Sequence, residues 1–497
     1  MPHIDDANRF DAEAILAVAD GEQLTLGSDL LASVDARSRE MRERLLSGDA
    51  VYGVTTGMGA ASEVRLDAAA QAAHQNTLML ARAVGSAPWL SRAEARAAVA
   101  VRLRTFLTLD AGVSAGLCSH LVDLLNRDLV PAIPRTRLGA AGEIIPLAHL
   151  GGAVNGTGVF LPSADGSPGT GTGLSEPLAP YSFGPKEGVA MLEGVPVTTA
   201  LALLRVRDAR ALATQAIALV ASEIELVGAS RDPFSPTTAR GDAELEQVLA
   251  AVLRLAGDTA QPRALQAPLS FRVLGPAVAH LLRAADAVAA AADRGLTGVT
   301  DSPAYLDDPH TGTARFIGTA GFDGFDLAAT LDALRVSVIH LAELSAARTH
   351  RLLDDRFTGL PRQLSDRPGL HAGMVAVHKR AVGVTHELLG ASRPASLGTI
   401  ETSLGQEDVQ SFSMEAAVAC DTAITGARDV FACELLAVVQ ASRLAGRTDA
   451  ATPAPQAGEV ARLVSAASAV LPTGTGDRAF GLDVERLTQL LADGWAL

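Results

Sequence analysis

The sequence predicts a mainly α-helical protein with a central bundle of long helices. Its composition is rich in alanine and leucine, with 48% hydrophobic but only 4% aromatic residues, which favours helix over sheet. Helical spacing of apolar residues extends over five long stretches, at about 197–228, 276–294, 324–353, 372–390 and 408–444. Because a helix of about 30 residues is about 45 Å long, several of them together indicate a bundle with active-site loops at its ends.

Shorter helices are expected on both sides of these stretches. Ser91 and Glu94 have the spacing of a capping box, which opens a helix that runs to about Leu107. Another helix follows Ser114 and is stopped by the prolines near residue 131. Two more helices, about 457–470 and 484–493, close the chain.

Strand signals are few and short. The Gly/Ser/Pro-rich stretch 162–180 is expected to be a surface loop. A boundary near residue 195 divides the chain into a loop-rich N-terminal active-site domain, 1–195, and a long-helix bundle domain with C-terminal helices, 196–497.

Charge and cysteine content exclude several classes of protein. A net charge of −15 argues against a nucleic-acid partner, which needs a basic face. Cys118, Cys420 and Cys433 lie in apolar helical contexts without metal-ligand spacing, so we expect buried thiols and no metal. There is no signal-peptide pattern, and charged residues interrupt the longest apolar stretch, 197–222. We therefore expect a cytoplasmic protein without a membrane span.

The most informative segment runs from Arg137 to Leu150 and contains Ala140-Ala141-Gly142. It resembles the signature segment of the aromatic amino acid lyases and aminomutases, a family that includes histidine, phenylalanine and tyrosine ammonia-lyases. In that family an Ala-Ser-Gly tripeptide cyclises and loses water, which gives the electrophilic group methylidene-imidazolone (MIO). Alanine has no hydroxyl to eliminate, so we expect no MIO and no other cofactor.

The segment from Val51 to Gly59 is similar to the family's tyrosine loop, which implies that Tyr52 is a catalytic base. Glycines at 53, 57 and 59 give the loop mobility. A phenol has a pKa of about 10 and needs a lowered pKa to act as a base. The alternative is a tyrosine that packs in a turn.

Two further segments depart from the family at positions that flank the substrate. Residues 75–85 resemble its substrate-selectivity helix, but Arg82 is foreign there and suggests an anionic or strongly polar ligand end. Residues 186–194 resemble the segment whose asparagine lies near MIO, and Glu193 takes that place. Its carboxylate could be an acid, a base or an ammonium partner. Arg82 and Glu193 could also pair with each other.

The C-terminal half keeps part of the family's site. Gln266 and Arg272 match residues that bind the substrate, the arginine clamping its carboxylate, whereas Leu269 replaces a second catalytic tyrosine. At two further positions Gly321 replaces an asparagine and Asp323 a histidine. Gln406, expected to bind substrate, and Glu407, expected to be catalytic, are retained in the last matching segment.

The resemblance runs in order from about residue 10 to 445. It implies the ammonia-lyase (L-aspartase-like) fold and a homotetramer whose active sites draw on three chains, with Tyr52 and Arg272 from different subunits. Five residues that depart from the family lie at positions that face the substrate, which is more than a point mutant would show. They are Arg82, Ala141, Glu193, Leu269 and Gly321.

The sequence therefore favours a MIO-independent lyase-like enzyme of specialised metabolism. It would act by proton abstraction, leading to elimination, isomerisation or cyclisation of a polar carboxylate-bearing small molecule. Two alternatives remain open, a non-catalytic ligand-binding or scaffold homologue, and an ammonia-lyase or aminomutase trapped by a Ser-to-Ala change.

Overall fold

The computed structural model describes residues 1–139, 141–162, 178–256, 262–446 and 458–496. Ala140 of the tripeptide and most of the expected loop 162–180 lie outside these ranges. The chain divides into two compact units. Unit 1 comprises Met1–Leu204, Val288–Asp332 and Pro394–Val418, and unit 2 comprises Arg205–Ala287, Ala333–Arg393 and Ala419–Leu497.

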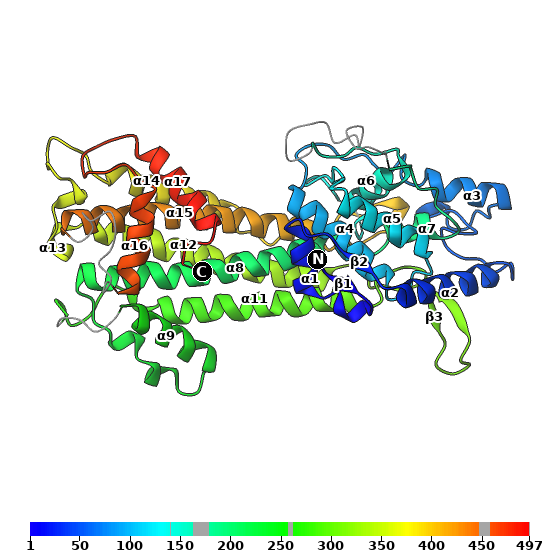
Figure 1. The fold of residues 1–497 in the computed structure, drawn as a ribbon, viewed down its shortest axis with the longest axis horizontal. Helices are drawn as coiled ribbons and strands as arrows, with labels where there is room; N and C mark the ends of the chain where they lie inside the picture. Colours follow the sequence, from blue (N-terminus) through cyan, green and yellow to red (C-terminus); the bar gives the residue numbers. More distant parts are fainter. Residues whose placement is uncertain (140, 163–177, 257–261, 447–457, 497) are drawn as a thin grey trace. The chain divides into compact units, whose positions relative to one another are not determined.

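Unit 1 combines short helices with two small sheets (Figure 1). Its helices are α1 Ala12–Ala19, α2 Ser28–Leu45, α3 Ala68–Thr77, α4 Arg92–Phe106, α5 Ala115–Asn126, α6 Ile144–Asn155 and α7 Glu187–Leu192. The parallel strands β1 His3–Ile4 and β2 Thr25–Leu26 form one sheet, and the antiparallel strands β3 Ala304–Asp307 and β4 Ala314–Ile317 form the other.

Long helices extend through both units, and unit 2 adds shorter ones. The long helices are α8 Pro196–Val227, α11 Leu274–Thr297, α12 Phe325–Leu352 and α15 Ser413–Leu444. The helices confined to unit 2 are α9 Ala243–Ala256, α10 Leu269–Arg272, α13 Asp355–Thr358, α14 Val375–Gly390, α16 Glu459–Ala469 and α17 Phe480–Ala492. The mainly helical class and all five predicted long stretches are confirmed. The units interleave along the chain, which differs from the predicted division at residue 195 into two continuous domains.

Helix α4 is the buried centre of unit 1, and its start has the predicted capping box. The Ser91 hydroxyl accepts from the Glu94 N–H, and the Glu94 carboxylate accepts from the Ser91 N–H. Together they satisfy two backbone donors that a helix start leaves unpaired.

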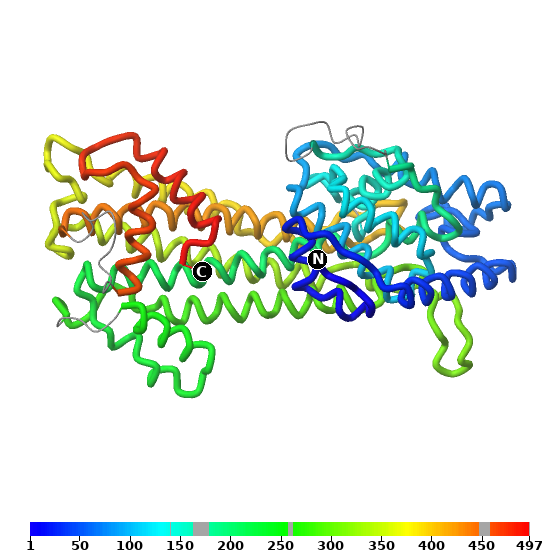
Figure 2. Tube along the Cα trace, viewed as in Figure 1, coloured from blue at the N-terminus to red at the C-terminus, as the bar shows by residue number. Residues whose placement is uncertain are grey.

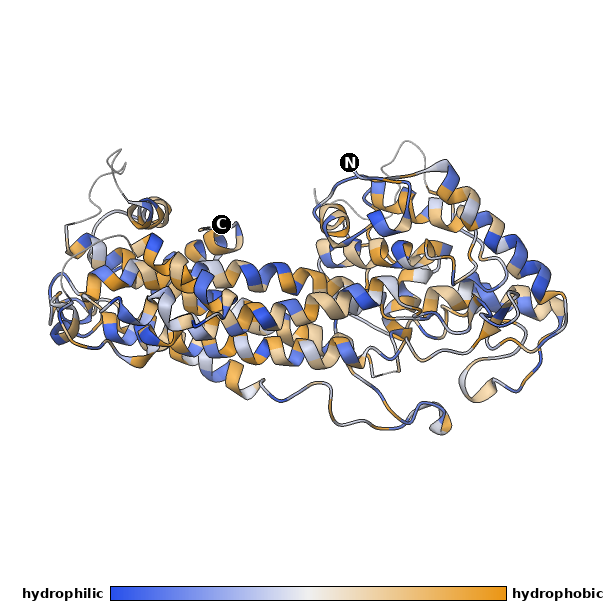
Figure 3. Ribbon diagram, turned by 90° about the horizontal axis from the view of Figure 1, so that it is seen from below, coloured by the Kyte–Doolittle hydropathy of each residue, from blue (hydrophilic) through white to orange (hydrophobic). Residues whose placement is uncertain are grey.

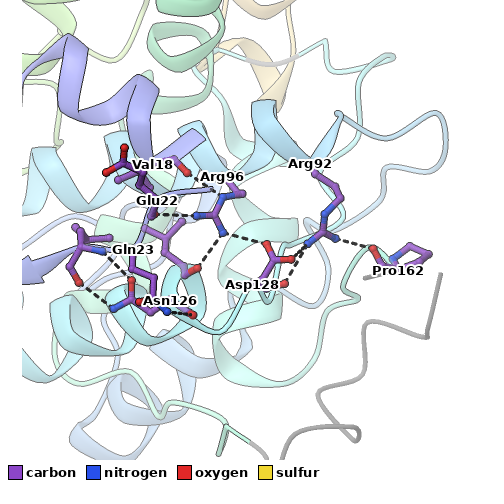
Figure 4. A network of polar contacts seen from close by, with 10 residues as sticks. Val18, Glu22, Gln23, Arg92, Arg96, Asn126, Asp128 and Pro162 are labelled. Atoms are coloured by element: carbon purple, nitrogen blue, oxygen red, sulfur yellow. Dashed lines mark hydrogen bonds and ion pairs between the residues drawn. The ribbon is translucent and has the colours of Figure 1, made fainter. Parts of the chain in front are cut away.

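Arg96 ties this helix to its neighbours (Figure 4). Its guanidinium donates to the backbone carbonyls of Val18 at 2.9 Å, Leu125 at 2.9 Å and Glu22 at 3.2 Å. It also pairs with Asp128 at 3.0 Å. A buried arginine thus closes the ends of α1 and α5 around α4.

A buried charge cluster joins three long helices in unit 2. The Arg348 guanidinium of α12 contacts Glu434 of α15 at 2.6 Å and Glu223 of α8 at 3.1 Å. Burial and the neighbouring Glu434 carboxylate raise the pKa of Glu223 well above its usual range. Glu223 therefore favours its neutral form, and Arg348 is then left with one carboxylate partner, Glu434.

Hydrophobic and hydrophilic residues are interspersed along the long helices (Figure 3), and a long apolar stretch includes α8. By length and composition, the stretch Glu187–Val227 could cross a membrane, contrary to the expectation from its charged residues. Its most apolar window is almost entirely buried within the protein, however. That burial is typical of a core helix, and apolar length alone carries no membrane assignment here.

The hairpin of β3 and β4 projects from unit 1 (Figure 2). Tyr305 of β3 lies opposite Phe316 of β4. The Arg37 guanidinium of α2 stacks 4.6 Å from the centre of the Tyr305 ring and donates to the Tyr305 carbonyl at 3.1 Å. This anchor fixes the base of the hairpin, where Pro303 and Phe316 reach the candidate site.

Candidate active site

A cavity of about 430 Å³ opens in unit 1 and brings together segments from six parts of the sequence. It is lined by Ala50, Val51, Tyr52, Met58, Ala141, Gly142, Glu143, Ile144, Leu192, Glu193, Gly194, Ser302, Pro303, Phe316, Gly318, Phe322, Gln406 and Glu407. The cavity therefore unites the predicted tyrosine loop, the degenerate tripeptide and the Glu193 and Glu407 segments.

The tyrosine loop closes on itself. The Gly53 N–H donates to the Gly57 carbonyl at 3.2 Å, and the Gly59 N–H donates to the Tyr52 hydroxyl oxygen at 2.7 Å. Gly53 has φ +66°, and a Cβ there would lie 2.9 Å from both Met58 and Val189. The glycine is thus required by backbone conformation and by close packing, and not only by loop mobility.

Tyr52 does not have the lowered pKa that a resting base would need. Burial raises the pKa of Tyr52, the Gly59 N–H opposes this shift, and the carboxylates of Glu193 and Glu407 add to it. Without a ligand the phenol is therefore neutral near pH 7. Since its oxygen already accepts from Gly59, its O–H is free to donate into the cavity.

Ala141 and Gly142 of the tripeptide precede helix α6. Ala141 and Gly142 line the cavity, and Gly142 has φ +67°. The next residue, Glu143, turns its carboxylate toward the first turn of α8, where it accepts from the N–H groups of Val197 at 2.7 Å and Thr198 at 2.6 Å. Burial raises the pKa of Glu143 to about 7, although these hydrogen bonds lower it.

Glu193 follows helix α7 and is the most unusual group of the site. It is only 9% exposed and lines the cavity. Among the described residues its carboxylate has neither a hydrogen bond nor an ion pair. Burial raises the pKa of Glu193 to about 8, and Asp301 raises it further, while Lys186 and Arg102 act in the opposite direction.

Two buried cations behind Glu193 were missed in the sequence. Arg102 of α4 donates to the backbone carbonyls of Ala190 at 2.6 Å and Glu193 at 2.5 Å. Burial lowers the pKa of Arg102 to about 10. Lys186 is fully buried and forms an ion pair with Asp301. The available signal was a charged residue inside an otherwise apolar segment, which costs energy unless it is paired.

Arg82 differs from its prediction. Helix α3 ends at Thr77, so Arg82 lies in the turn that follows and not on a selectivity helix. It is absent from the cavity lining and donates to the Leu78 carbonyl at 3.1 Å. Burial lowers the pKa of Arg82, whereas Tyr52, Glu193 and Glu407 oppose that shift, so it is close enough to act on them electrostatically. Arg82 and Glu193 do not form an ion pair.

Glu407 is held by its own loop. The Thr402 hydroxyl donates to its carboxylate at 2.7 Å, and the Thr402 N–H donates to its carbonyl at 2.8 Å. Gln406 beside it is exposed and also lines the cavity. Both predicted residues therefore reach the site.

Gln266 and Arg272 lie in unit 2 and are not among the lining residues. Gln266 is exposed, and Arg272 is half-buried at the end of α10 without an ion pair in the described part of the chain. Leu269, which replaces the family's second tyrosine, is 62% exposed.

At Gly321 the backbone of a neighbouring segment occupies the space that a side chain would need. A Cβ there would lie 2.1 Å from the Val299 carbonyl oxygen, so the main chain itself occupies that space. Asp323 accepts from the Phe325 N–H at 3.1 Å and caps helix α12. Gly321 thus leaves room for the main chain, and Asp323 accepts a backbone hydrogen bond.

The sequence predicted no metal site and three buried cysteine thiols. Within the described ranges, no group of three His, Cys, Asp or Glu side chains is placed to hold a metal ion. Cys118, Cys420 and Cys433 are free and buried, as predicted for the thiols.

The helical fold, and a cavity lined by a tyrosine loop and a tripeptide segment, define the class of lyases and aminomutases described above. The sequence model of the aromatic amino acid lyases matches residues 10–466. A histidine ammonia-lyase of Gloeobacter violaceus is 31% identical over 476 residues, covering 93% of this chain and 90% of that protein. The chain belongs to the aromatic amino acid lyase family.

Solved structures agree with the fold. A tyrosine aminomutase mutant with a bound ligand superposes with a TM-score of 0.90 at 25% identity, covering 100% of this chain and 98% of the other. An ergothioneine-degrading enzyme, ergothionase, from Treponema denticola gives a TM-score of 0.90 at 22% identity and covers 100% of both chains. The predicted ammonia-lyase fold is therefore confirmed.

Proposed function

We propose that this protein is a MIO-independent enzyme that removes a proton from a polar, carboxylate-bearing small molecule. Elimination, isomerisation and cyclisation can all begin with that step. The observation that carries the proposal is the position of Ala141 on the wall of the same cavity as Tyr52, Glu193 and Glu407. The acid–base groups of a lyase site are thus present, without the hydroxyl from which MIO is made.

The residues present do not fit MIO. Its methylidene carbon is a serine β-carbon after the hydroxyl has left, and Ala141 has only a methyl group there. General base catalysis alone contributes about 10²–10⁴-fold. That is too little to replace the electrophile in the deamination of phenylalanine or histidine. The substrate should therefore have a more acidic proton or a better leaving group than an aromatic amino acid.

Proton transfer is assigned to Tyr52, Glu193 and Glu407. A pKa of about 8 makes Glu193 a stronger base, once ionised, than an ordinary glutamate, and lies close to a working pH of 7 to 8. Tyr52 is a neutral donor in the resting site and can act as a base when a cationic ligand lowers its pKa. Substrate binding is assigned to Arg82, Gln266, Arg272 and Gln406.

A homotetramer with shared sites is part of the proposal. Large apolar side chains are exposed beside each substrate-binding segment, which is typical of surfaces that a partner covers. They are Leu80 and Val84 around Arg82, Leu265 at 91% and Leu269 at 62% around Gln266, and Leu404 at 96% beside Gln406. We infer that Tyr52 and Arg272 meet in one site when they come from different subunits.

Mixing variants tests the shared site. Tyr52→Phe and Arg272→Ala should each be inactive alone, and refolding them together should restore part of the activity in mixed tetramers. Leu404→Glu should shift the mass in light scattering below that of a tetramer. The matched control is Leu46→Glu, because Leu46 is equally apolar and 86% exposed but is adjacent in sequence to none of the substrate-binding residues. A wild-type monomer with full activity would contradict the shared site.

Turnover tests the reaction. We expect the enzyme to convert carboxylates with good leaving groups at the carbon next to the carboxylate, with new ultraviolet absorbance from the double bond. Phenylalanine, tyrosine and histidine should release no ammonia. Glu193→Gln should lower kcat at least 100-fold, while Glu13→Gln on the exposed face of α1 should not change it. Efficient deamination of histidine by the unmodified chain would overturn the proposal, and tight ligand binding without any turnover would favour the scaffold alternative.

A further inference from the structure

We propose that Arg348 is a positioning residue for Arg272. Its buried guanidinium holds the turn α10, which carries Arg272, in the position from which Arg272 binds a carboxylate. This inference rests on the proposed function, in which Arg272 is one of the residues that bind the substrate. Both arginines belong to unit 2, and so do all the contacts that connect them.

The turn α10 is short and depends on its surroundings. Ser270 and Phe271 are buried in its middle. Leu269 at its start is 62% exposed, and Arg272 at its end is half-buried. The N–H groups of Phe271 and Arg272 both donate to the Pro268 carbonyl, at 3.1 and 3.4 Å. A helix of a single turn is not stable by itself, so contacts with neighbouring elements must hold it in place.

Arg348 of α12 supplies the polar contact. Its Nη1 donates to the Ser270 carbonyl at 3.2 Å. Its Nε and Nη2 donate to the Glu434 carboxylate at 2.6 and 3.0 Å, and the whole side chain is buried. A guanidinium holds its donors in a rigid plane, so the two bonds to Glu434 fix the direction of Nη1. The position of the Ser270 carbonyl is thereby fixed as well.

Two glutamates from other long helices hold the guanidinium. Glu434 of α15 also accepts from the Ser345 hydroxyl at 2.7 Å, and Glu223 of α8 lies 3.1 Å from Arg348. Burial and the adjacent carboxylate raise the pKa of Glu223, which therefore favours its neutral form. The cluster then has one positive and one negative charge. Because three long helices contribute to it, the cluster is a rigid support for α10.

The second anchor of α10 is apolar. The Phe271 ring packs against Phe357 of α13, with 5.9 Å between the ring centres. The Ser270 carbonyl and the Phe271 ring thus hold the turn at two adjacent residues. The Nε–H of Arg272 is buried and has no acceptor among the residues that the structure describes. A buried donor without an acceptor is costly, and a carboxylate ligand would supply one.

Two measurements on the full-length protein test the inference. Hydrogen exchange at the amides of Phe271, Arg272 and Val273 reports how firmly α10 is held, without any ligand. Isothermal titration with 3-phenylpropanoate and its neutral analogue 3-phenylpropanamide reports whether Arg272 binds a carboxylate. We expect the wild type to bind the carboxylate at least about tenfold more tightly than the amide. Arg272→Ala should bind both probes equally.

Arg348→Met should remove the preference for the carboxylate and accelerate exchange in α10 at least about tenfold. This change also leaves Glu434 buried without its partner, which is destabilising. A second variant therefore replaces the whole cluster, with Glu223→Leu, Arg348→Met and Glu434→Leu together. Apolar replacement of a complete buried ion cluster is often neutral or stabilising. This triple variant should fold and still show both losses.

Arg443→Met is the matched control. Arg443 of α15 is also a buried arginine of unit 2 that donates to backbone carbonyls, but these carbonyls belong to residues 468–474. Its loss should lower the unfolding free energy and leave both the exchange in α10 and the carboxylate preference unchanged.

Unchanged exchange in α10 of the triple variant would overturn the inference. Faster exchange with a retained carboxylate preference would overturn it too, since Arg272 would then bind without a fixed turn. The same two losses in Arg443→Met would attribute them to general destabilisation and would equally overturn it. A wild type that binds both probes alike would instead contradict the role of Arg272 in the proposed function. The exchange experiment would then still decide whether Arg348 holds α10.

Discussion

The hydroxyl oxygen of Tyr52 accepts a hydrogen bond from the Gly59 N–H across 2.7 Å, so the tyrosine loop supplies the contact that orients its own tyrosine. The phenol is positioned before any ligand arrives. Burial keeps the pKa of Tyr52 raised, so the phenol remains a neutral hydrogen-bond donor near pH 7.

Tyr52→Phe should therefore affect both activity and the loop. Loss of the acceptor leaves the half-buried Gly59 N–H without a partner, at a cost of about 1–3 kcal/mol in unfolding free energy. Turnover should fall by at least about 100-fold, the usual contribution of an acid–base group. Urea unfolding and steady-state kinetics measure the two effects. Tyr305→Phe, outside the cavity, should leave kcat unchanged; full activity of Tyr52→Phe would remove Tyr52 from the mechanism.

Ala141→Ser should restore the missing hydroxyl but not ammonia-lyase activity. Glu193 still replaces an asparagine and Leu269 a tyrosine, so two further groups of the lyase site remain different. Neither cinnamate from phenylalanine nor urocanate from histidine is expected. Intact mass shows whether the tripeptide has lost two waters in this variant and in the parent chain. Robust product formation by the single variant would support the trapped-lyase alternative.

Lys186→Met should destabilise unit 1 strongly. It leaves Asp301 buried without its counter-ion, which costs about 3–5 kcal/mol. Adding Asp301→Asn should recover part of that loss, since both charges are then absent. The matched control is Arg210→Met, whose ion pair with Asp286 is about half exposed at both side chains and should matter little. Chemical unfolding of these three variants and the wild type gives the comparison. Equal losses of unfolding free energy in Lys186→Met and Arg210→Met would contradict the buried pair.

Glu143→Ala should weaken the start of α8. Two buried N–H donors, of Val197 and Thr198, lose their acceptor, for a total of about 2–6 kcal/mol. Glu143→Gln keeps one oxygen and should be less harmful. Hydrogen exchange at the two amides reports the effect locally, and unchanged protection in the alanine variant would exclude the capping role.

Glu193→Gln should change how stability depends on pH. The pKa of Glu193 is raised from 4.5 to about 8 in the fold, so folding favours its protonated form. That contribution is fully present below pH 4.5 and is lost as pH rises through 8. Glutamine stays neutral at every pH. Between pH 4.5 and about 8, the unfolding free energy of the variant should therefore rise relative to the wild type by about 1.4 kcal/mol per pH unit. Above pH 8 the difference should stay constant. A constant difference from pH 5 to 9 would contradict the raised pKa.

The fold could be predicted because the apolar spacing of the long helices and the capping box at Ser91 are local signals. Tyr52, Glu193 and Glu407 were found because each lies in a motif that resembles a family segment. Arg102, Lys186 and Asp301 escaped notice, since their roles depend on contacts between segments that are far apart in sequence. Residues 75–85 were read as one helix because nothing in them marks the end of α3 at Thr77, so Arg82 lies in the following turn.

Pocket residues without chemistry of their own were the hardest to predict. Phe316 comes from a strand, Phe322 from the turn after it, and Leu192 from the end of α7. Only the folded hairpin and helix bring them to one wall. A resemblance that compares motifs can find the groups that react, but it does not find the surface that selects what reacts.

The main chain at Gly321 affects whether the asparagine that the family has at this position could be restored. A Cβ there would sit 2.1 Å from the Val299 carbonyl oxygen, so a larger residue cannot simply be reinstalled. An asparagine at this position would require a different path of the chain between β4 and α12. A single amino-acid substitution is easily reversed by another one, whereas a changed path of the main chain needs several substitutions at once to reverse.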